Sequence, residues 1–343
     1  MKAVRFISWG ISICILVSAA ALSVHSLWPS DCTSPLAPGA DLRECDLRSR
    51  DFAGKELENL ILAGADLRDV DFSRARLTNV RFENARLAGA NFTAATLSGV
   101  HFTEAGLDGV NFTDSVLHDS SIILAVLTRA NLKNTHLENS RIEHTDLSGA
   151  SLHGTYIRQS SMVSSRFDKV IFDGVTLSAV SFRHADFNHT RIRRSEISDI
   201  QIYAVKFSDL EFSDSNLTGI NRSQRSGLPI TGTRLSLIRS CLSESYFDSA
   251  RIAELVMEST RLHDINLDGA EIGMARLADF SLDQVSLGRN HQNVPFSLEE
   301  LQSSDVRISR TSLDEARIQG DISAFVSVDH RLKSIAANCR PSS

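Results

Sequence analysis

A large apolar residue occupies every fifth position of the chain from Leu42 to Leu217 without a gap. This makes 36 consecutive units, and only Leu, Phe, Ile and Met occupy the position. The residue two places earlier is usually small or β-branched, and Asp or Asn often stands between the two. A period of five fits neither an α-helix, which repeats at 3.6 residues, nor an alternating strand, which repeats at two. The chain is therefore expected to coil into a solenoid that buries one apolar side chain per unit.

The unit A-(D/N)-(L/F)-x-x resembles the repeat of the pentapeptide-repeat family, as in Ala40-Asp41-Leu42 and Ala90-Asn91-Phe92. The resemblance covers residues 40 to about 290. It implies an all-β fold, a right-handed quadrilateral β-helix with four units in each 20-residue coil and about 12 to 14 coils in all. By analogy with the family, a homodimer through the C-terminal coils is a further expectation.

The positions of Phe and Pro support four five-residue units in each coil. Residues 20 apart would be neighbours on adjacent coils, and Leu fills the two sides between the Phe positions. All six prolines fall outside the regular units, as expected if Pro would remove a hydrogen-bond donor from a ladder. The predicted core stack on one side consists of Phe52, Phe72, Phe92 and Phe112.

The N-terminal segment, residues 1–28, has the pattern of an export signal. Lys2 and Arg5 precede an uncharged apolar stretch from Phe6 to about Val24, which matches the charged and apolar regions of a signal peptide. Cleavage near residues 19–21 is one interpretation. A retained inner-membrane anchor through residues 6–24 is the other, because the stretch approaches the ~20 residues that span a bilayer. Either way we expect export to the periplasm or cell envelope, with membrane contact only through this segment.

The exported part holds four cysteines, an even number suited to an oxidising compartment. They can pair in three ways. We favour Cys32 with Cys45, which would brace an N-terminal cap over residues 29–39, and Cys241 with Cys339, which would tie the tail back. The alternative for Cys45 is a buried thiol, because it stands where the repeat uses small residues.

The repeat is interrupted once and then ends. The apolar position fails at Arg222, Gly227 and Gly232 and resumes in the same frame at Leu237, so the interruption equals one coil and predicts an irregular coil or a protruding loop. The predicted division is a signal peptide or anchor over 1–28, a cap over 29–39, regular β-helix over 40–218, the irregular segment over 219–236, continued β-helix over 237–288 and a C-terminal cap over 289–343.

The C-terminal cap is expected to contain short helices. Residues 297–300 read Ser-Leu-Glu-Glu, a capping-box pattern that predicts the start of a helix. Three residual repeat units follow in a shifted frame, at Ile308, Leu313 and Ile318. Residues 321–337 have apolar residues at roughly helical spacing and predict an amphipathic helix.

No motif for catalysis, cofactor binding or metal binding stands out in the chain. No P-loop, G-x-G-x-x-G, H-E-x-x-H or C-x-x-C sequence occurs, and histidines stand singly at outward repeat positions. A solenoid filled with Leu and Phe leaves no evident pocket for polar groups to converge on. We therefore expect no catalytic residue, no cofactor and no metal.

The near balance of positive and negative charges disfavours a nucleic-acid partner. Lys and Arg number 36 against 42 for Asp and Glu, a net charge of -6. The basic cluster Arg191, Arg193 and Arg194 is predicted to be a structural charge ladder, because a 20-residue coil places its members beside carboxylates. The expected partners are Glu211 for Arg191, Asp173 for Arg193 and Asp214 for Arg194.

Outward-facing apolar residues are rare in the repeat, so a cluster of them indicates a contact with another protein. The candidate contact patch consists of Val116, Ile123, Leu124 and Val126. The predicted function is a non-enzymatic exported scaffold that binds an unidentified protein in the periplasm or envelope. One alternative is an effector or surface protein delivered outside the cell. Another follows from the family, in which some members resemble DNA and protect DNA gyrase; the export signal and mixed charge disfavour it.

Overall fold

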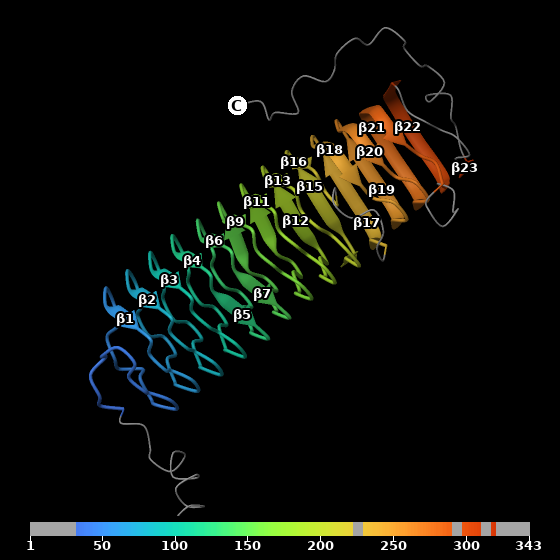
Figure 1. Cartoon of the computed structure of the whole chain (residues 1–343). Helices are drawn as coiled ribbons and strands as arrows, with labels where there is room; N and C mark the ends of the chain where they lie inside the picture. The colour runs from blue at the N-terminus through green and yellow to red at the C-terminus, as the bar shows by residue number, and fades with distance from the viewer. Residues whose placement is uncertain (1–31, 222–228, 290–296, 310–316, 320–343) are drawn as a thin grey trace, which may run out of the picture.

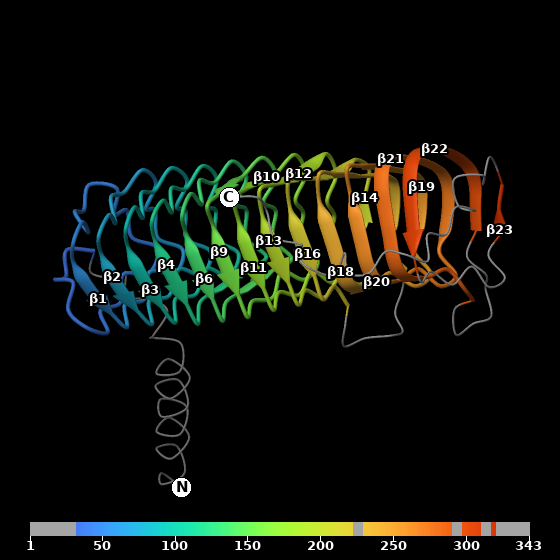
Figure 2. The ribbon, with the colours of Figure 1, turned by 90° about the horizontal axis from the view of Figure 1, so that it is seen from above.

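The described part of the chain is one long parallel β-solenoid. The computed structural model describes residues 32–221, 229–289, 297–309 and 317–319, and they form about 12 turns. The coils stack along a rod from the N-terminal end, blue, to the C-terminal end, red (Figure 1). Turning the rod shows one long ladder of short strands along a single face (Figure 2). The secondary structure of these residues is strand and turn, without a helix.

Each five-residue unit forms one side of a coil. A residue pairs with the residue 20 positions later, as Leu57 pairs with Leu77, and the paired strands run parallel. Coils of four units follow, as predicted. We number the sides by their first central residue: the first side begins with Leu42, the second with Leu47, the third with Phe52 and the fourth with Leu57.

Strands are short in the N-terminal coils and long in the C-terminal ones. The fourth side carries β1 (Glu56–Glu58), β2 (Arg76–Thr78), β3 (Thr96–Ser98), β4 (Val116–His118), β6 (His136–Glu138), β9 (Tyr156–Arg158), β11 (Thr176–Ser178), β13 (Glu196–Ser198), β16 (Asn216–Thr218), β18 (Cys241–Tyr246) and β20 (Arg261–Asn266). The first side carries β5 (Ser121–Ile123) and β7 (Arg141–Glu143), the second β14 (Lys206–Phe207), and the third β8 (Ser151–His153), β10 (Ile171–Asp173), β12 (Thr190–Arg193) and β15 (Leu210–Ser213). The strands of the last coils are β17 (Thr231–Ile238), β19 (Arg251–Glu258), β21 (Glu271–Ser286), β22 (Ser297–Ser309) and β23 (Arg317–Ile318).

Two phenylalanine stacks fill the core of the N-terminal coils. On the third side, neighbouring rings of the predicted stack Phe52, Phe72, Phe92 and Phe112 lie 4.7–5.1 Å apart between centroids. Phe82 and Phe102 form a second stack from the opposite, first side, with centroids 5.0 Å apart. The two stacks meet edge to face at 5.8–6.2 Å. All six rings are fully buried, so each coil is locked to the next by aromatic contacts as well as by its ladders.

The backbone at the corners of the coil accounts for the other positions of the repeat. The residue two places after the central one has positive φ, as in Asp69 and Asn79, and Asn, Asp or Gly adopts this conformation at low cost. The residue two places before the central one is buried against the preceding coil, where Ser and Thr replace Ala in the middle of the rod. Their hydroxyls are satisfied by backbone: Thr135 Oγ1 donates to the carbonyl of Phe112 at 2.8 Å.

The interruption of the repeat is shorter than the full coil that the sequence predicts. Phe212 pairs with Leu237 and not with position 232, where a regular coil would place its partner, and β17 resumes the coil at Thr231. Only five residues are inserted. The apolar pattern suggested a longer interruption, because Gly232 occupies a central position but has no side chain. The ring of Phe207 occupies that space, and a Cβ on Gly232 would lie 1.9 Å from it.

An interior cavity of about 80 Å³ lies near this insertion. The residue two places before the central one is large in Leu210, Leu235 and Leu255, where the N-terminal coils use mostly small or β-branched residues. Leu210 and Leu235 line the cavity. Its lining residues are all apolar, Phe207 and Leu235 among them.

The β-helix extends beyond its predicted end at residue 288. Residues 297–309, expected to open with a helix, form β22 instead. Leu298 is buried and pairs with Ile272, so six residues are inserted relative to a regular coil and the frame resumes at Leu298. Pairing along the whole of β21 outweighs a local capping preference that is worth only about 1 kcal/mol. Ile318 pairs in turn with Leu298. The helix predicted over 321–337 lies outside the described residues.

Candidate protein-contact surface

The side chains that flank each central residue point outward and form rows along the rod. On the third side, Asn91 Nδ2 donates to Asp71 Oδ1 at 3.0 Å, and Asn111 Nδ2 donates to Asn91 Oδ1 at 3.3 Å. The backbone N–H and the hydroxyl of Thr93 also donate to Asn91 Oδ1. These polar groups therefore satisfy one another, and the row stabilises the stacking of coils.

Charged side chains on the second side pair with one another in the same way. Asp66 accepts hydrogen bonds from Arg68 Nε and Nη2 at 2.8 and 2.6 Å. Arg48 and Arg86, one coil before and one after, also approach it, at 3.7 and 3.6 Å. The hydrogen bond from Arg68 lowers the pKa of Asp66 to about 2. Mixed pairing of this kind gives no sustained acidic stripe on this side.

We expect Asp66→Asn to destabilise the protein at pH 7 and to have much less effect at pH 2. The carboxylate has a lower pKa in the folded chain than its unfolded value of about 3.9, so its contribution is complete above about pH 4 and is lost as the pH falls through about 2. The expected loss at pH 7 is about 0.5–1 kcal/mol, because the surrounding arginines are exposed. Urea unfolding at both pH values measures it, and an equal difference at pH 2 would show that the ionised carboxylate is not the cause.

The arginine cluster on the third side is a structural charge ladder with one changed partner. Arg191 lies 3.7 Å from Glu211, and Arg193 lies 3.7 Å from Asp173, as predicted. Arg194 hydrogen-bonds Asp173, at 2.8 and 2.5 Å, and not Asp214. Asp214 accepts from Arg239 instead, which occupies the same corner one coil later. Arg194 also lowers the pKa of Asp173 through these hydrogen bonds.

The structure separates the four residues of the candidate patch. Ile123 and Leu124 lie at the corner between the first and second sides, and Val126 lies next to them on the second side. Val116 lies in β4 on the fourth side, which is opposite the second. The contact surface therefore consists of Ile123, Leu124 and Val126. Val116, 40% exposed, is a separate apolar residue on another face.

Leu124 is an unusual residue for its place in the backbone. Its φ is +56°, and it is the only large apolar residue among the described non-glycine residues with positive φ. Other corners use Gly, Ala or polar residues. The left-handed conformation costs a bulky residue about 1 kcal/mol or more, and the side chain is 54% exposed. Neither backbone geometry nor core packing therefore accounts for a leucine here.

Polar residues surround this apolar spot. Glu104 and His144 occupy the same corner one coil before and one coil after Leu124. On the second side, Val126 pairs with Gly106 below and with Asp146 above, and Asp146 pairs with Arg166 at 3.3 Å. An exposed apolar centre with a polar rim is the arrangement found at energetic centres of protein interfaces.

The sequence analysis missed Ile171, which is 43% exposed on the third side. It lies in β10 between Ser151 and Arg191 on the ladder. The signal was present, because Ile171 directly precedes the central residue Phe172 and so had to point outward. It stands alone on its side among the exposed large apolar residues of the described chain.

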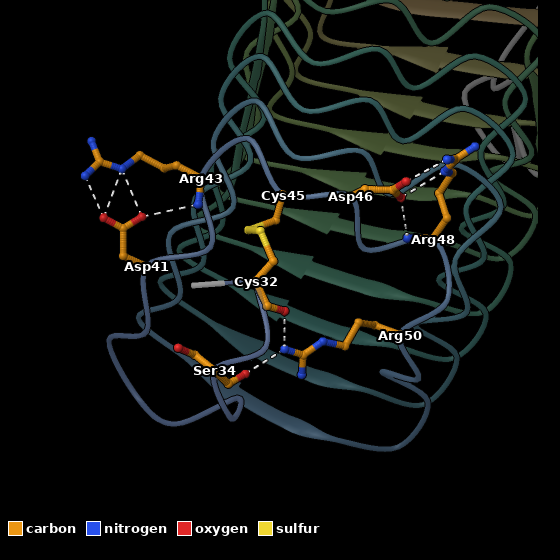
Figure 3. The surroundings of a disulfide bond; sticks show 8 residues. All are labelled: Cys32, Ser34, Asp41, Arg43, Cys45, Asp46, Arg48 and Arg50. Carbon is orange, nitrogen blue, oxygen red and sulfur yellow. Dashed lines mark hydrogen bonds and ion pairs between the residues drawn. A yellow bond between two sulfur atoms is a disulfide. The ribbon is translucent and has the colours of Figure 1, made fainter. Parts of the chain in front are cut away.

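A disulfide closes the N-terminal end of the rod. Cys32 and Cys45 are bonded, with Cα atoms 5.5 Å apart (Figure 3). The Arg50 guanidinium donates to the carbonyls of Cys32 and Ser34, at 2.8 and 2.6 Å, and holds the same segment against the first coil. Cys241 is also disulfide-bonded. Its predicted partner, Cys339, lies outside the described residues.

The residues that the structure describes contain no group of three or more His, Cys, Asp or Glu side chains that could hold a metal ion. Within those residues, none of the chain forms a helix with the length and apolarity needed to cross a membrane. The segment over 1–28, predicted to be a signal peptide or anchor, lies outside them.

The geometry defines the protein as a parallel β-solenoid with four-sided, five-residue-unit coils. Two family models match its sequence, one for a pentapeptide repeat region over residues 40–112 and one for eight copies of the pentapeptide repeat over residues 125–162. Both matched stretches therefore consist of pentapeptide repeats. A search of the curated proteins finds no match.

Solved structures of pentapeptide-repeat proteins are similar to this chain. HetL of the cyanobacterium Nostoc sp. strain PCC 7120, involved in regulating heterocyst differentiation, is 21% identical, with a TM-score of 0.30 and coverage of 70% of this chain and 90% of HetL. Full-length QnrB1, a plasmid-mediated fluoroquinolone resistance protein, is 18% identical, with a TM-score of 0.27 and coverage of 52% and 83%. A protein of the Arabidopsis thaliana thylakoid lumen is 29% identical, with a TM-score of 0.21 and coverage of 35% and 66%.

Proposed function

We propose that the protein is a non-enzymatic, exported scaffold that binds another protein in the periplasm or cell envelope. The observation that carries the proposal is Leu124, an exposed leucine at a left-handed corner that the fold itself does not require. With Ile123 and Val126 it offers an apolar centre inside a polar rim. A partner that buries these side chains would gain about 25 cal/mol for each Å² of apolar surface removed from water.

The interior of the rod supports a binding role over a catalytic one. Two cavities inside the described coils, about 80 and 50 Å³, are lined by apolar residues. Many outward polar side chains of the second and third sides are engaged in ladders and ion pairs. Catalysis needs polar groups that converge on one substrate position, whereas a rigid rod with fixed surface rows is suited to holding a partner.

Export is the second part of the proposal and rests on the N-terminus and the cysteines. Lys2, Arg5 and the apolar stretch to Val24 have the order of a signal segment. The bond between Cys32 and Cys45 suits an oxidising compartment. Delivery to the outside of the cell remains the alternative destination, and gyrase protection would require a reduced protein in the cytoplasm.

Photocrosslinking in intact cells tests both parts of the proposal. A photoreactive amino acid at position 124 is expected to give a protein adduct in the periplasmic or envelope fraction, whereas the same residue at position 171 is not. Ile171 is the matched control, because it is also an exposed apolar residue of the rod but lies on another side.

Binding measurements with the purified protein and its crosslinked partner then give the size of the effect on affinity. Leu124→Asp should weaken binding of the crosslinked partner about 30-fold or more, the effect of removing an interface centre worth ~2 kcal/mol. Ile171→Asp should leave binding unchanged. Equal adducts from both positions, or adducts only in the cytoplasmic fraction, would contradict the proposal.

A further inference from the structure

The fourth side of the rod carries two rows of outward side chains between β3 and β11 (Figure 2). The row directly before the central residues, here called the ring row, consists of Thr96, Val116, His136, Tyr156 and Thr176. The row directly after them, here called the polar row, consists of Ser98, His118, Glu138, Arg158 and Ser178. Members of a row are neighbours on successive coils, so four steps of ~4.8 Å make each row about 19 Å long. The two rows form one strip that follows the axis of the rod.

The ring row presents rings and methyl groups that are partly or fully exposed. The rings of His136 and Tyr156 are in contact, with centroids 5.6 Å apart. Val116 is 40% exposed and lies beside His136 on the ladder. Thr96 and Thr176 continue the row at its two ends, each with a methyl and a hydroxyl group. The row is thus apolar along its middle but only one side chain wide.

The polar groups of this strip are little used by the rod itself. On the third side, amides and hydroxyls hydrogen-bond one another along the row. Within the described chain, by contrast, the hydroxyls of Thr96, Ser98 and Thr176 form no hydrogen bond with another residue. Glu138 and Arg158 lie 3.7 Å apart, and about half of each side chain is exposed. A ligand can therefore reach donors and acceptors here without breaking the ladders.

We propose that this strip of the fourth side binds an extended, uncharged glycan strand that lies along the rod. The C–H groups on the face of a sugar ring pack against aromatic rings, whose faces carry partial negative charge. The ring row offers that contact at His136 and Tyr156. The hydroxyls at the edge of the sugars meet the polar row, where the Glu138 carboxylate accepts hydrogen bonds and the Arg158 guanidinium donates them.

Spacing and charge select this kind of ligand. Successive coils are ~4.8 Å apart, close to the length of one sugar unit in an extended β-1,4-linked chain, so sugars and coils stay nearly in step along the strip. Apart from its histidines, the strip carries the charges of Glu138 and Arg158, which cancel. A protein partner is disfavoured, because a protein interface needs a cluster of apolar side chains that it can enclose, and the ring row is one side chain wide.

The first test compares two uncharged hexasaccharides on the exported full chain. Chitohexaose is β-1,4-linked and extended, whereas maltohexaose is α-1,4-linked and coils, so it cannot follow a straight row. Calorimetry should show chitohexaose binding about tenfold tighter or more, the effect of aromatic contacts that the coiled chain cannot make. Absence of chitohexaose binding, or equal binding of the two sugars, would overturn the proposal.

The second test places the glycan on the fourth side. Tyr156→Ala should weaken chitohexaose binding about tenfold or more, while Tyr156→Phe, which keeps the ring, should cost about threefold or less. Tyr203→Ala is the matched control and should leave binding unchanged, because Tyr203 contacts His184 in the same way, at 5.6 Å, on the first side.

An equal loss from Tyr203→Ala would refute the site. A photoreactive amino acid at position 136 that forms a protein adduct in intact cells would refute it as well, because the strip would then bind a protein. The inference does not rest on the proposed function: the Leu124 surface lies away from the fourth side, and Leu124→Asp should leave chitohexaose binding unchanged.

Discussion

Replacing Phe92 by alanine should lower the free energy of unfolding by about 3–5 kcal/mol, the loss expected for a buried aromatic residue. Phe92 stacks between Phe72 and Phe112, with centroids 4.7 and 5.1 Å away, and meets Phe82 and Phe102 edge to face. Alanine would therefore interrupt the third-side stack and remove its edge-to-face contacts with Phe82 and Phe102. The backbone is held by ladders above and below, so it can collapse only slightly into the space.

Denaturant unfolding followed by circular dichroism measures this effect. Phe92→Leu is the matched control, because other coils carry leucine at central positions, and it should cost less than half as much as the alanine change. Asn91→Ala, on the outward row next to it, should cost about 1 kcal/mol, the value of a hydrogen bond. An alanine variant at position 92 as stable as the leucine variant would mean that the stacks do not hold the coils together.

Removing the Cys32–Cys45 disulfide should cost about 3 kcal/mol. The bond closes a segment of 13 residues in sequence separation, and a cross-link of this length restricts the unfolded chain by about that amount. In the folded state the hydrogen bonds from Arg50 to the carbonyls of Cys32 and Ser34 also hold this segment, in addition to the disulfide. The cap that covers the first coil would then lose its covalent tie and keep its hydrogen bonds, among them those from Arg50 and the one from the Gly39 N–H to the carbonyl of Glu58.

Thermal and urea unfolding of Cys32→Ser/Cys45→Ser, compared with the parent protein, gives the value. Arg50→Lys provides a comparison that weakens the polar contacts and keeps the disulfide; we expect a loss of about 1 kcal/mol for it. If the double serine variant unfolded at the same urea concentration as the parent, the disulfide would not brace the first coil.

The regular part of the fold could be predicted from sequence, because the position of a residue in the five-residue repeat determines its side of the coil and whether it faces inward or outward. Phe52 and Phe72 are four units apart, with no residue inserted between the units, so they lie on the same side of adjacent coils. Residue spacing alone therefore predicted the stack. The same counting could have placed Val116 on the side opposite Val126. Arg194 was assigned to the wrong carboxylate because a long side chain at a corner can reach either neighbouring coil, and residue spacing does not distinguish them.

The irregular parts could not be read in this way. Gly232 contributes no side chain, so its central position shows only in the pairing of Lys206 and Phe207 with β17. Leu298 follows six inserted residues and a sequence with helical capping preference, and only its pairing with Ile272 reveals a strand. Leu124 was noticed as an apolar residue, but its importance comes from the backbone angle, which the sequence does not state.

The hydrogen bonds between coils run along the axis of the rod, from each coil to the next (Figure 1). A force that pulls the two ends apart would therefore act on every contact between neighbouring coils. The rod would separate first at the place where two neighbouring coils are packed least well. We expect this place to be the contact between Phe207 and Gly232, because Gly232 carries no central side chain and Phe207 lines the interior cavity of about 80 Å³. A protein that connects two points of an envelope would thus have a built-in point of mechanical yielding in its C-terminal half, while the phenylalanine-filled half would stay intact.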